Sequence, residues 1–146
     1  MKLFNRAAFA ILFYAVTTAP TGAFAEDLKL KKIMQDLAGE MEAIVRAISL
    51  EDYGTVHDRA LGIAGHEKPP VEERMMILKF LQADAAGFKA ADGVVHDSAA
   101  RLAAAADKKD HYGVVGAFMD VLNGCVDCHA KYRGRVLEQF YRPGAE

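Results

Sequence analysis

Two cysteines and a histidine near the C-terminus are the residues best placed to do chemistry in this chain. Cys125, Cys128 and His129 stand in the stretch NGCVDCHAKYRG, and the sequence holds no other cysteine. On a helix, where each residue advances by about 100°, the three side chains project to one side. Two thioether-forming thiols and an axial nitrogen on one side suit a covalently held macrocycle, and C-x-x-C-H is the attachment signature of haem c. The motif predicts one covalent haem, held by the two thiols, with His129 as an iron ligand.

Other uses of a C-x-x-C pair remain as alternatives with less support. A thioredoxin-like redox pair lies at a helix N-terminus after a strand, and no strand is predicted before Cys125. A structural zinc site needs four ligands. A disulfide between positions i and i+3 of a helix has poor geometry. The remaining histidines are scattered along the sequence, at His57, His66, His96 and His111.

The first 25 residues have the pattern of a secretory signal peptide. Lys2 and Arg6 precede an apolar run of ten residues, and Ala23-Phe24-Ala25 provides a small-x-small cleavage pattern. The apolar run is short for a membrane span, so we expect cleavage, a periplasmic location and no stable membrane insertion, with an uncleaved anchor as the alternative. The expected mature domain, residues 26–146, has 121 residues, enough to bury a core.

Charge argues against a nucleic-acid partner. Without Lys2 and Arg6, the mature chain has 16 basic residues against 20 acidic ones, a formal charge of −4. Proteins that bind nucleic acid through the phosphate backbone usually present a basic surface instead.

Apolar residues recur at gaps of three and four, which predicts an all-α fold. We expect four helices, at about 27–48, 50–65, 71–106 and 109–140. Ser49 and Asp52 resemble a capping box between the first two helices, Pro70 can open the third, and the turn Asp107–Asp110 can cap the fourth. Short connections between amphipathic helices favour an antiparallel up-down-up-down four-helix bundle.

With its haem motif in the last helix, the chain resembles the class II c-type cytochromes, the cytochrome c-prime family. In that family a Tyr/Phe-Arg pair follows the motif, as Tyr132-Arg133 does here, and an aromatic often stands where Phe88 stands. The segment KIMQDLAGEM resembles the opening of the low-spin branch, where an early methionine binds the iron. Met34 occupies that position. One departure is the short connection AGHEKPPVEER, because the family usually has a longer one between helices two and three.

The resemblance implies a haem c whose iron is held by His129 and Met34. Simple geometry agrees, since the two residues lie at heights of roughly 16 and 10 Å from the same end of the expected bundle. A methionine on an apolar stripe is otherwise ordinary core filler. Asp92 interrupts an apolar stripe and lies either near the haem edge or in solvent. The other expected cofactor-binding residues are Cys125, Cys128, Arg133, Tyr132 and Leu37, with Met41 as further pocket wall.

The predicted function is electron transfer to and from periplasmic redox partner proteins. Lys29, Lys31 and Lys32 form a small basic cluster that could meet an acidic partner. The alternative is a five-coordinate haem protein that binds nitric oxide or carbon monoxide. We expect no enzyme activity, because no catalytic acid/base pair or distal His/Arg pair can be assembled. In relatives, helices one and two often form a dimer surface, which makes a homodimer a further expectation.

Overall fold

The computed structural model describes residues 28–141, so the predicted signal peptide lies outside the described part of the chain. This part is helical throughout apart from short connections. None of its helices is long and apolar enough to cross a membrane. In chain order the helices are α1 (Lys29–Ser49), α2 (Tyr53–Ala64), α3 (Val71–Leu81), the 3-10 turn η1 (Gln82–Asp84), α4 (Ala85–Asp107), α5 (His111–Cys128), the π-turn η2 (His129–Arg133) and α6 (Gly134–Tyr141).

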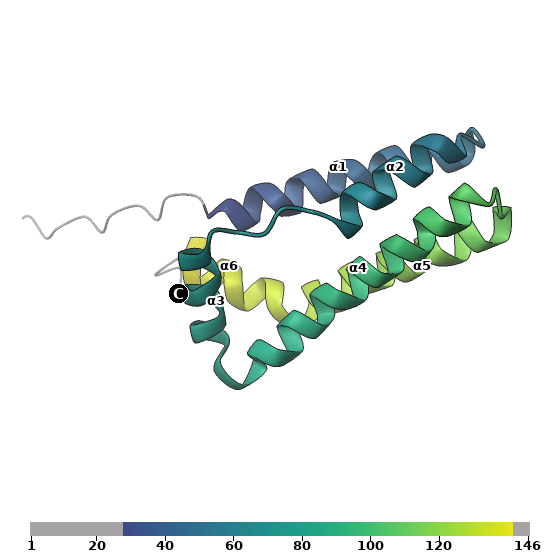
Figure 1. Ribbon diagram of the computed structural model, residues 1–146. Coiled ribbons are helices and arrows are strands. Elements are labelled where there is room, and N and C mark those ends of the chain that lie inside the picture. The colour runs from purple at the N-terminus through teal and green to yellow at the C-terminus, as the bar shows by residue number, and fades with distance from the viewer. Residues whose placement is uncertain (1–27, 142–146) are drawn as a thin grey trace, which may run out of the picture.

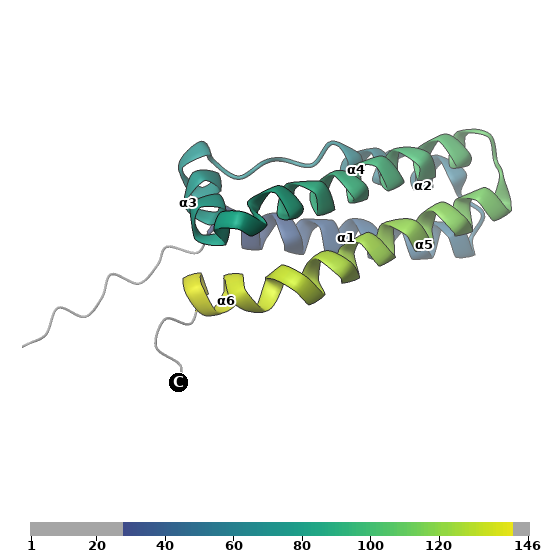
Figure 2. The same ribbon diagram turned by 90° about the horizontal axis from the view of Figure 1, so that it is seen from below.

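Four long helices form the predicted antiparallel up-down-up-down bundle. In Figures 1 and 2, α1 and α2 run in opposite directions, as do α4 and α5, and α6 continues the line of α5. Along the chain α1 packs against α2, α2 against α4, and α4 against α5. The all-α fold class is therefore confirmed. The main core takes residues from all four long helices: Ile44, Ala47, Val56, Ala60, Ile63, Val95, Ala99, Leu102, Ala103, Ala106, Val114 and Val121.

Two aspartates cap helices of the bundle. The Asp52 carboxylate accepts a hydrogen bond from the Thr55 amide at 3.1 Å and begins α2, and Asp110 accepts from the Gly113 amide at 3.0 Å and begins α5. The predicted cap of the fourth helix is confirmed. The second helix starts at Tyr53 rather than near Leu50, because Asp52 and not Ser49 satisfies its first free amides.

The predicted third helix, 71–106, is wrong as a single element. The chain breaks at Gln82, whose φ of 49° and ψ of −115° leave the helical region, and α3 turns across the end of the bundle (Figure 1). Glu73 of α3 accepts hydrogen bonds from the amides of Lys29 and Leu30 at 2.9 and 2.8 Å. The carboxylate thereby caps the positive end of α1, which helps hold α3 in this position.

A second, smaller core lies where α3 meets the end of the bundle. Its buried members are Ile77, Leu81 and Tyr132, and Phe80 and Phe140 pack edge-on beside them with ring centroids 5.4 Å apart. In the sequence, helical periodicity continues through residues 78–88 without a Gly or Pro at the break. No local signal therefore indicates that Ile77 and Leu81 serve this separate cluster.

The last predicted helix, 109–140, follows one continuous path but changes its hydrogen-bonding pattern. α5 ends at Cys128, and a π-turn runs from His129 to Arg133 before α6 resumes the α pattern. Single π-turns within α-helices are rare and occur often at functional sites. Here the π-turn begins at the histidine of the C-x-x-C-H motif.

Close packing of Gly87 against Tyr132 gives a stability prediction. A Cβ added at Gly87 would lie 2.6 Å from the Tyr132 hydroxyl oxygen, so Gly87→Ala should destabilise the fold by about 1–3 kcal/mol. Removing the hydroxyl with Tyr132→Phe should recover most of that loss, which chemical denaturation of the four proteins in a double-mutant cycle would measure. Gly116→Ala, where a Cβ meets nothing within 4 Å, is the control and should be neutral or mildly stabilising. Equal losses at both glycines would contradict a steric cause.

Candidate functional site

A cavity of 480 Å³ opens at the end of the bundle where α3 crosses it. This volume falls within the range of about 300–1,000 Å³ that is usual for cofactor and ligand pockets. Its walls come from α1, the α2–α3 connection, α3, the start of α4 and the end of α5. The lining residues are Leu30, Met34, His66, Lys68, Pro69, Val71, Arg74, Met75, Ile77, Leu78, Phe88, Lys89, Asp92 and Cys128.

The cavity brings together two residues that were predicted to share one site. Met34, half-buried on α1, and Cys128, half-buried at the end of α5, both line it, although they are far apart in sequence. Leu37 and Met41 lie further along α1, where they pack against the main core and not in the cavity lining. Met75 of α3 is a second methionine in the lining, 61% exposed, which no sequence motif marks.

The two cysteines are half-buried free thiols. Burial raises the pKa of the Cys125 thiol, and it also raises the pKa of Cys128, where the charges of Asp92 and Cys125 add to the effect. Redox-active C-x-x-C pairs have a lowered thiol pKa, commonly at a helix N-terminus. Because this pair lies at the C-terminal end of α5 and its pKa values are raised, the thioredoxin-like alternative loses support.

His129 does not face the core, contrary to the stripe expected from the sequence. Its side chain is exposed and does not line the cavity. Val121 and Gly124 are buried, and they lie on the same side of α5 as Cys128. His129 follows Cys128 directly, so its side chain points about 100° away from that side. Partial burial of the ring still lowers the pKa of His129, and the Arg133 charge lowers it further. A lowered pKa favours the neutral imidazole, the form that binds metals.

The remaining predicted residues divide between core and surface. Tyr132 is buried next to Cys128 in the smaller core, and its ring meets Phe88 edge-on with centroids 5.3 Å apart. Arg133 is exposed, at the end of the π-turn. Tyr132 therefore packs in the core beside the motif, whereas the Arg133 side chain is exposed to solvent and does not line the cavity.

The residues of the cavity fit a haem in part. Its walls are largely apolar, as a macrocycle requires, and Cys128 of the attachment motif opens into it, whereas Cys125 packs against the main core and His129 does not line the cavity. Arg74 lines the cavity, and its buried Nε atom has no hydrogen-bond partner among the described residues. A buried donor without a partner is costly, and a carboxylate of a bound cofactor would satisfy it.

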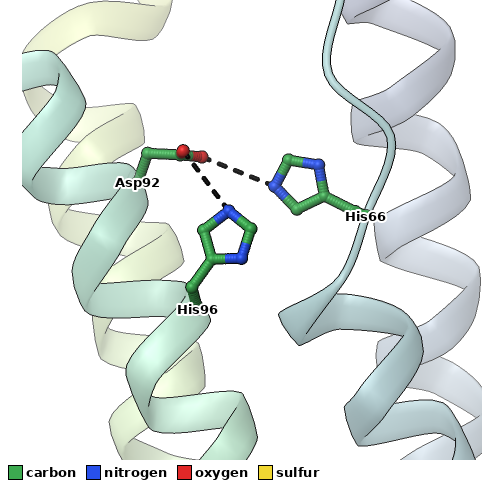
Figure 3. Close-up of side chains that lie close together, drawn as sticks. All are labelled: His66, Asp92 and His96. Carbon is green, nitrogen blue, oxygen red and sulfur yellow. Dashed lines mark ion pairs between the residues drawn. The ribbon is translucent and has the colours of Figure 1, made fainter.

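Two histidines that are far apart in sequence meet at Asp92 beside this cavity (Figure 3). The Nε2 atoms of His66 and His96 each lie 3.4 Å from an Asp92 carboxylate oxygen. Hydrogen bonding to Asp92 raises the pKa of His66, and the same interaction lowers the pKa of Asp92. These histidines were expected to be scattered, and the fold brings them together. The i,i+4 spacing of Asp92 and His96 was a readable signal, but nothing in the sequence pointed to His66.

The fold is a helical bundle, and its C-x-x-C-H motif has the spacing of the c-type haem proteins. Residues 73–133 match the family model of Cytochrome C', which covers 61 of the 146 residues. The match includes the haem motif and Phe88 and supports the cytochrome c-prime family, in which a haem c cofactor is implied. Met34 lies outside the matched range. No curated protein and no solved structure matches the chain.

Proposed function

We propose that this protein is an exported electron carrier with one covalently bound haem c, whose iron is held by His129 and Met34. The observation that carries the proposal is that Met34 and Cys128, from opposite ends of the chain, line one cofactor-sized cavity. Members of the supported family are typically exported, which agrees with the predicted signal peptide. The proposal includes no catalytic role.

Each residue of the site has a defined task in this proposal. Cys125 and Cys128 would hold the cofactor through thioether bonds, and the Met34 thioether and the His129 imidazole, once turned toward the cavity, would bind its iron. Bound haem supplies a one-electron couple at iron, and methionine ligation raises its potential. The apolar residues of the cavity would exclude water from the bound cofactor.

A second candidate function is reversible binding of nitric oxide or carbon monoxide. The family match is confined to residues 73–133 and does not include Met34, so it supports the family without supporting the methionine-ligated branch. If Met34 leaves the iron free, the distal side is an apolar pocket with room for a small gas molecule.

The visible absorption spectrum of the exported holoprotein tests the choice between these functions. We expect a sharp low-spin spectrum on reduction, a far-red sulfur-to-iron band on oxidation, and slow or absent carbon monoxide binding. A broad high-spin spectrum with immediate uptake of carbon monoxide would instead establish the gas-binding function.

The proposed partners are periplasmic redox proteins, but the basic cluster on α1 offers them little free charge. Lys29 pairs with Glu67 at 3.2 Å, and Lys32 pairs with Asp36 on the next turn. Exposed ion pairs of this kind are weak and readily exchanged. An acidic partner would therefore compete with internal carboxylates for these lysines, and the association rate should fall steeply with salt.

A further inference from the structure

We propose that His66, Asp92 and His96 form a second metal site, which binds a divalent transition-metal ion and is separate from the haem iron. Asp92 and His96 stand one turn apart on α4, and His66 comes from the α2–α3 connection (Figure 3). Both imidazole rings point toward the one carboxylate. It is the one group of three potential metal ligands whose donor atoms converge, to within 4.8 Å of one another, in the described residues.

The spacing of the donor atoms suits tetrahedral coordination. Zinc binds histidine nitrogen and carboxylate oxygen at about 2.0–2.2 Å, so neighbouring ligands of a tetrahedral site lie about 3.3–3.5 Å apart. The two separations from histidine Nε2 to Asp92 oxygen are both 3.4 Å. The two separations run to different oxygens of Asp92, Oδ1 for His66 and Oδ2 for His96. Because all three donor atoms lie within 4.8 Å of one another, rotation of the carboxylate and of the rings would bring them around one ion.

Main-chain carbonyls orient both histidines for metal binding. The Nδ1 of His66 donates to the Glu67 carbonyl at 2.8 Å, and the Nδ1 of His96 donates to the Ala64 carbonyl. When Nδ1 carries the proton, the lone pair of a neutral imidazole is on Nε2, which here faces Asp92. Metal-binding histidines usually have this outer hydrogen bond, which fixes the tautomer and the ring orientation.

A bound cation would take the place of a proton in this arrangement. With each Nδ1 donating to a carbonyl, only an imidazolium can also donate from Nε2 to Asp92, and the two rings are stacked, with centroids 4.6 Å apart and an interplanar angle of 20°. One divalent ion would accept both lone pairs and neutralise the carboxylate, with no second positive charge on the neighbouring ring. The donors are imidazole and carboxylate without thiolate, a set that suits zinc and related divalent ions.

Exposure of the three side chains leaves an entry path for the ion. The histidine side chains are 10% and 22% exposed, whereas Asp92 is 45% exposed. Three protein ligands would leave the fourth position to water, which can reach the site from the side of Asp92. A bound ion would tie the α2–α3 connection to α4, and because His66 and Asp92 also line the haem cavity, it would fix part of the cavity wall.

Zinc titration of the haem-loaded protein, without an affinity tag and after treatment with a chelator, tests the site. We expect isothermal titration calorimetry to show one Zn²⁺ per chain, with the affinity reduced at least tenfold in His66→Gln and in His96→Gln. His57→Gln is the matched control, because His57 lies on α2 and pairs with Asp58 at 3.0 Å, outside the cluster. This variant should bind zinc like the wild type.

Two further readouts distinguish a zinc site from a role of these histidines at the haem. Zinc should raise the thermal unfolding temperature of the wild type but not of His96→Gln, and it should leave the spin state of the haem unchanged. Absence of zinc binding, or equal loss of affinity in His57→Gln, would overturn the proposal. The proposal would also be overturned if the wild type took up no zinc and the haem spectrum of His66→Gln differed from that of the wild type. His66 would then act at the haem.

Discussion

Replacing Met34 with alanine is expected to convert the haem iron from six-coordinate low-spin to five-coordinate high-spin. Met34 lines the cavity that Cys128 also lines, and in our proposal it would bind the iron together with His129. The bundle should survive, because the main core lies elsewhere and the thioether bonds remain. Since Met34 is only half-buried, the loss of folding stability should be near the lower end of about 2–5 kcal/mol. Optical and electron paramagnetic resonance spectra of the variant would measure the spin state.

Carbon monoxide binding provides the second measurement on the Met34 variant. The reduced variant should bind carbon monoxide rapidly, whereas the wild type should bind it slowly or not at all, because the ligand must first displace the thioether. If the haem iron of the wild type is already high-spin, the result would contradict methionine ligation and favour the gas-binding function.

Two other methionines provide the comparisons that make the Met34 experiment decisive. Met41 packs against the main core away from the cavity, so Met41→Ala should keep the low-spin spectrum. Met75 lines the cavity from α3 but is 61% exposed, and Met75→Ala should also keep it. If Met75→Ala gives the high-spin spectrum and Met34→Ala does not, the ligand comes from α3 and the resemblance to the low-spin branch fails at this residue.

The parts of the fold that depend on local signals were predictable from the sequence. Helical periodicity located the four long helices, and a cap such as Asp110 acts on an amide three residues away, within reach of sequence reasoning. The break at Gln82 was not predictable, because it depends on Ile77 and Leu81 packing beside Tyr132, about 50 residues further on, and on Glu73 capping α1. Such tertiary contacts override local helix preference.

The candidate site was predictable where a motif defined it and not where the fold assembles it. The C-x-x-C-H spacing located the attachment point, and the family resemblance pointed to Met34. The direction of His129 was misjudged, because His129 fits the same apolar stripe as Cys125, yet Cys125 packs against the main core and His129 is exposed. His66 lies in a connection between helices, so periodicity says nothing about its direction, and only the packed chain brings it to Asp92.

Replacing both cysteines, with Cys125→Ala and Cys128→Ala, is expected to abolish covalent attachment of the haem. Wild-type protein should carry the mass of one haem, which acid-acetone extraction does not remove, whereas the double variant should have the mass of the polypeptide alone. Asp127→Ala is the matched control: it changes an exposed residue between the cysteines, keeps the C-x-x-C-H spacing, and should retain the haem mass. Extraction of the haem from the wild type would contradict thioether attachment.

The double variant should also become less ordered at one end of the bundle. The main core is built from α1, α2, α4 and α5 without the cavity residues, so far-ultraviolet circular dichroism should still report helices. The cavity of 480 Å³ would lose the group proposed to fill it, and its largely apolar walls would be exposed to water. We therefore expect α3 and the adjoining ends of α1 and α4 to lose fixed packing, with a weakened near-ultraviolet signal and faster amide exchange in residues 71–92 than in residues 95–106. Uniform amide exchange along α4 would show instead that the two cores unfold as one unit.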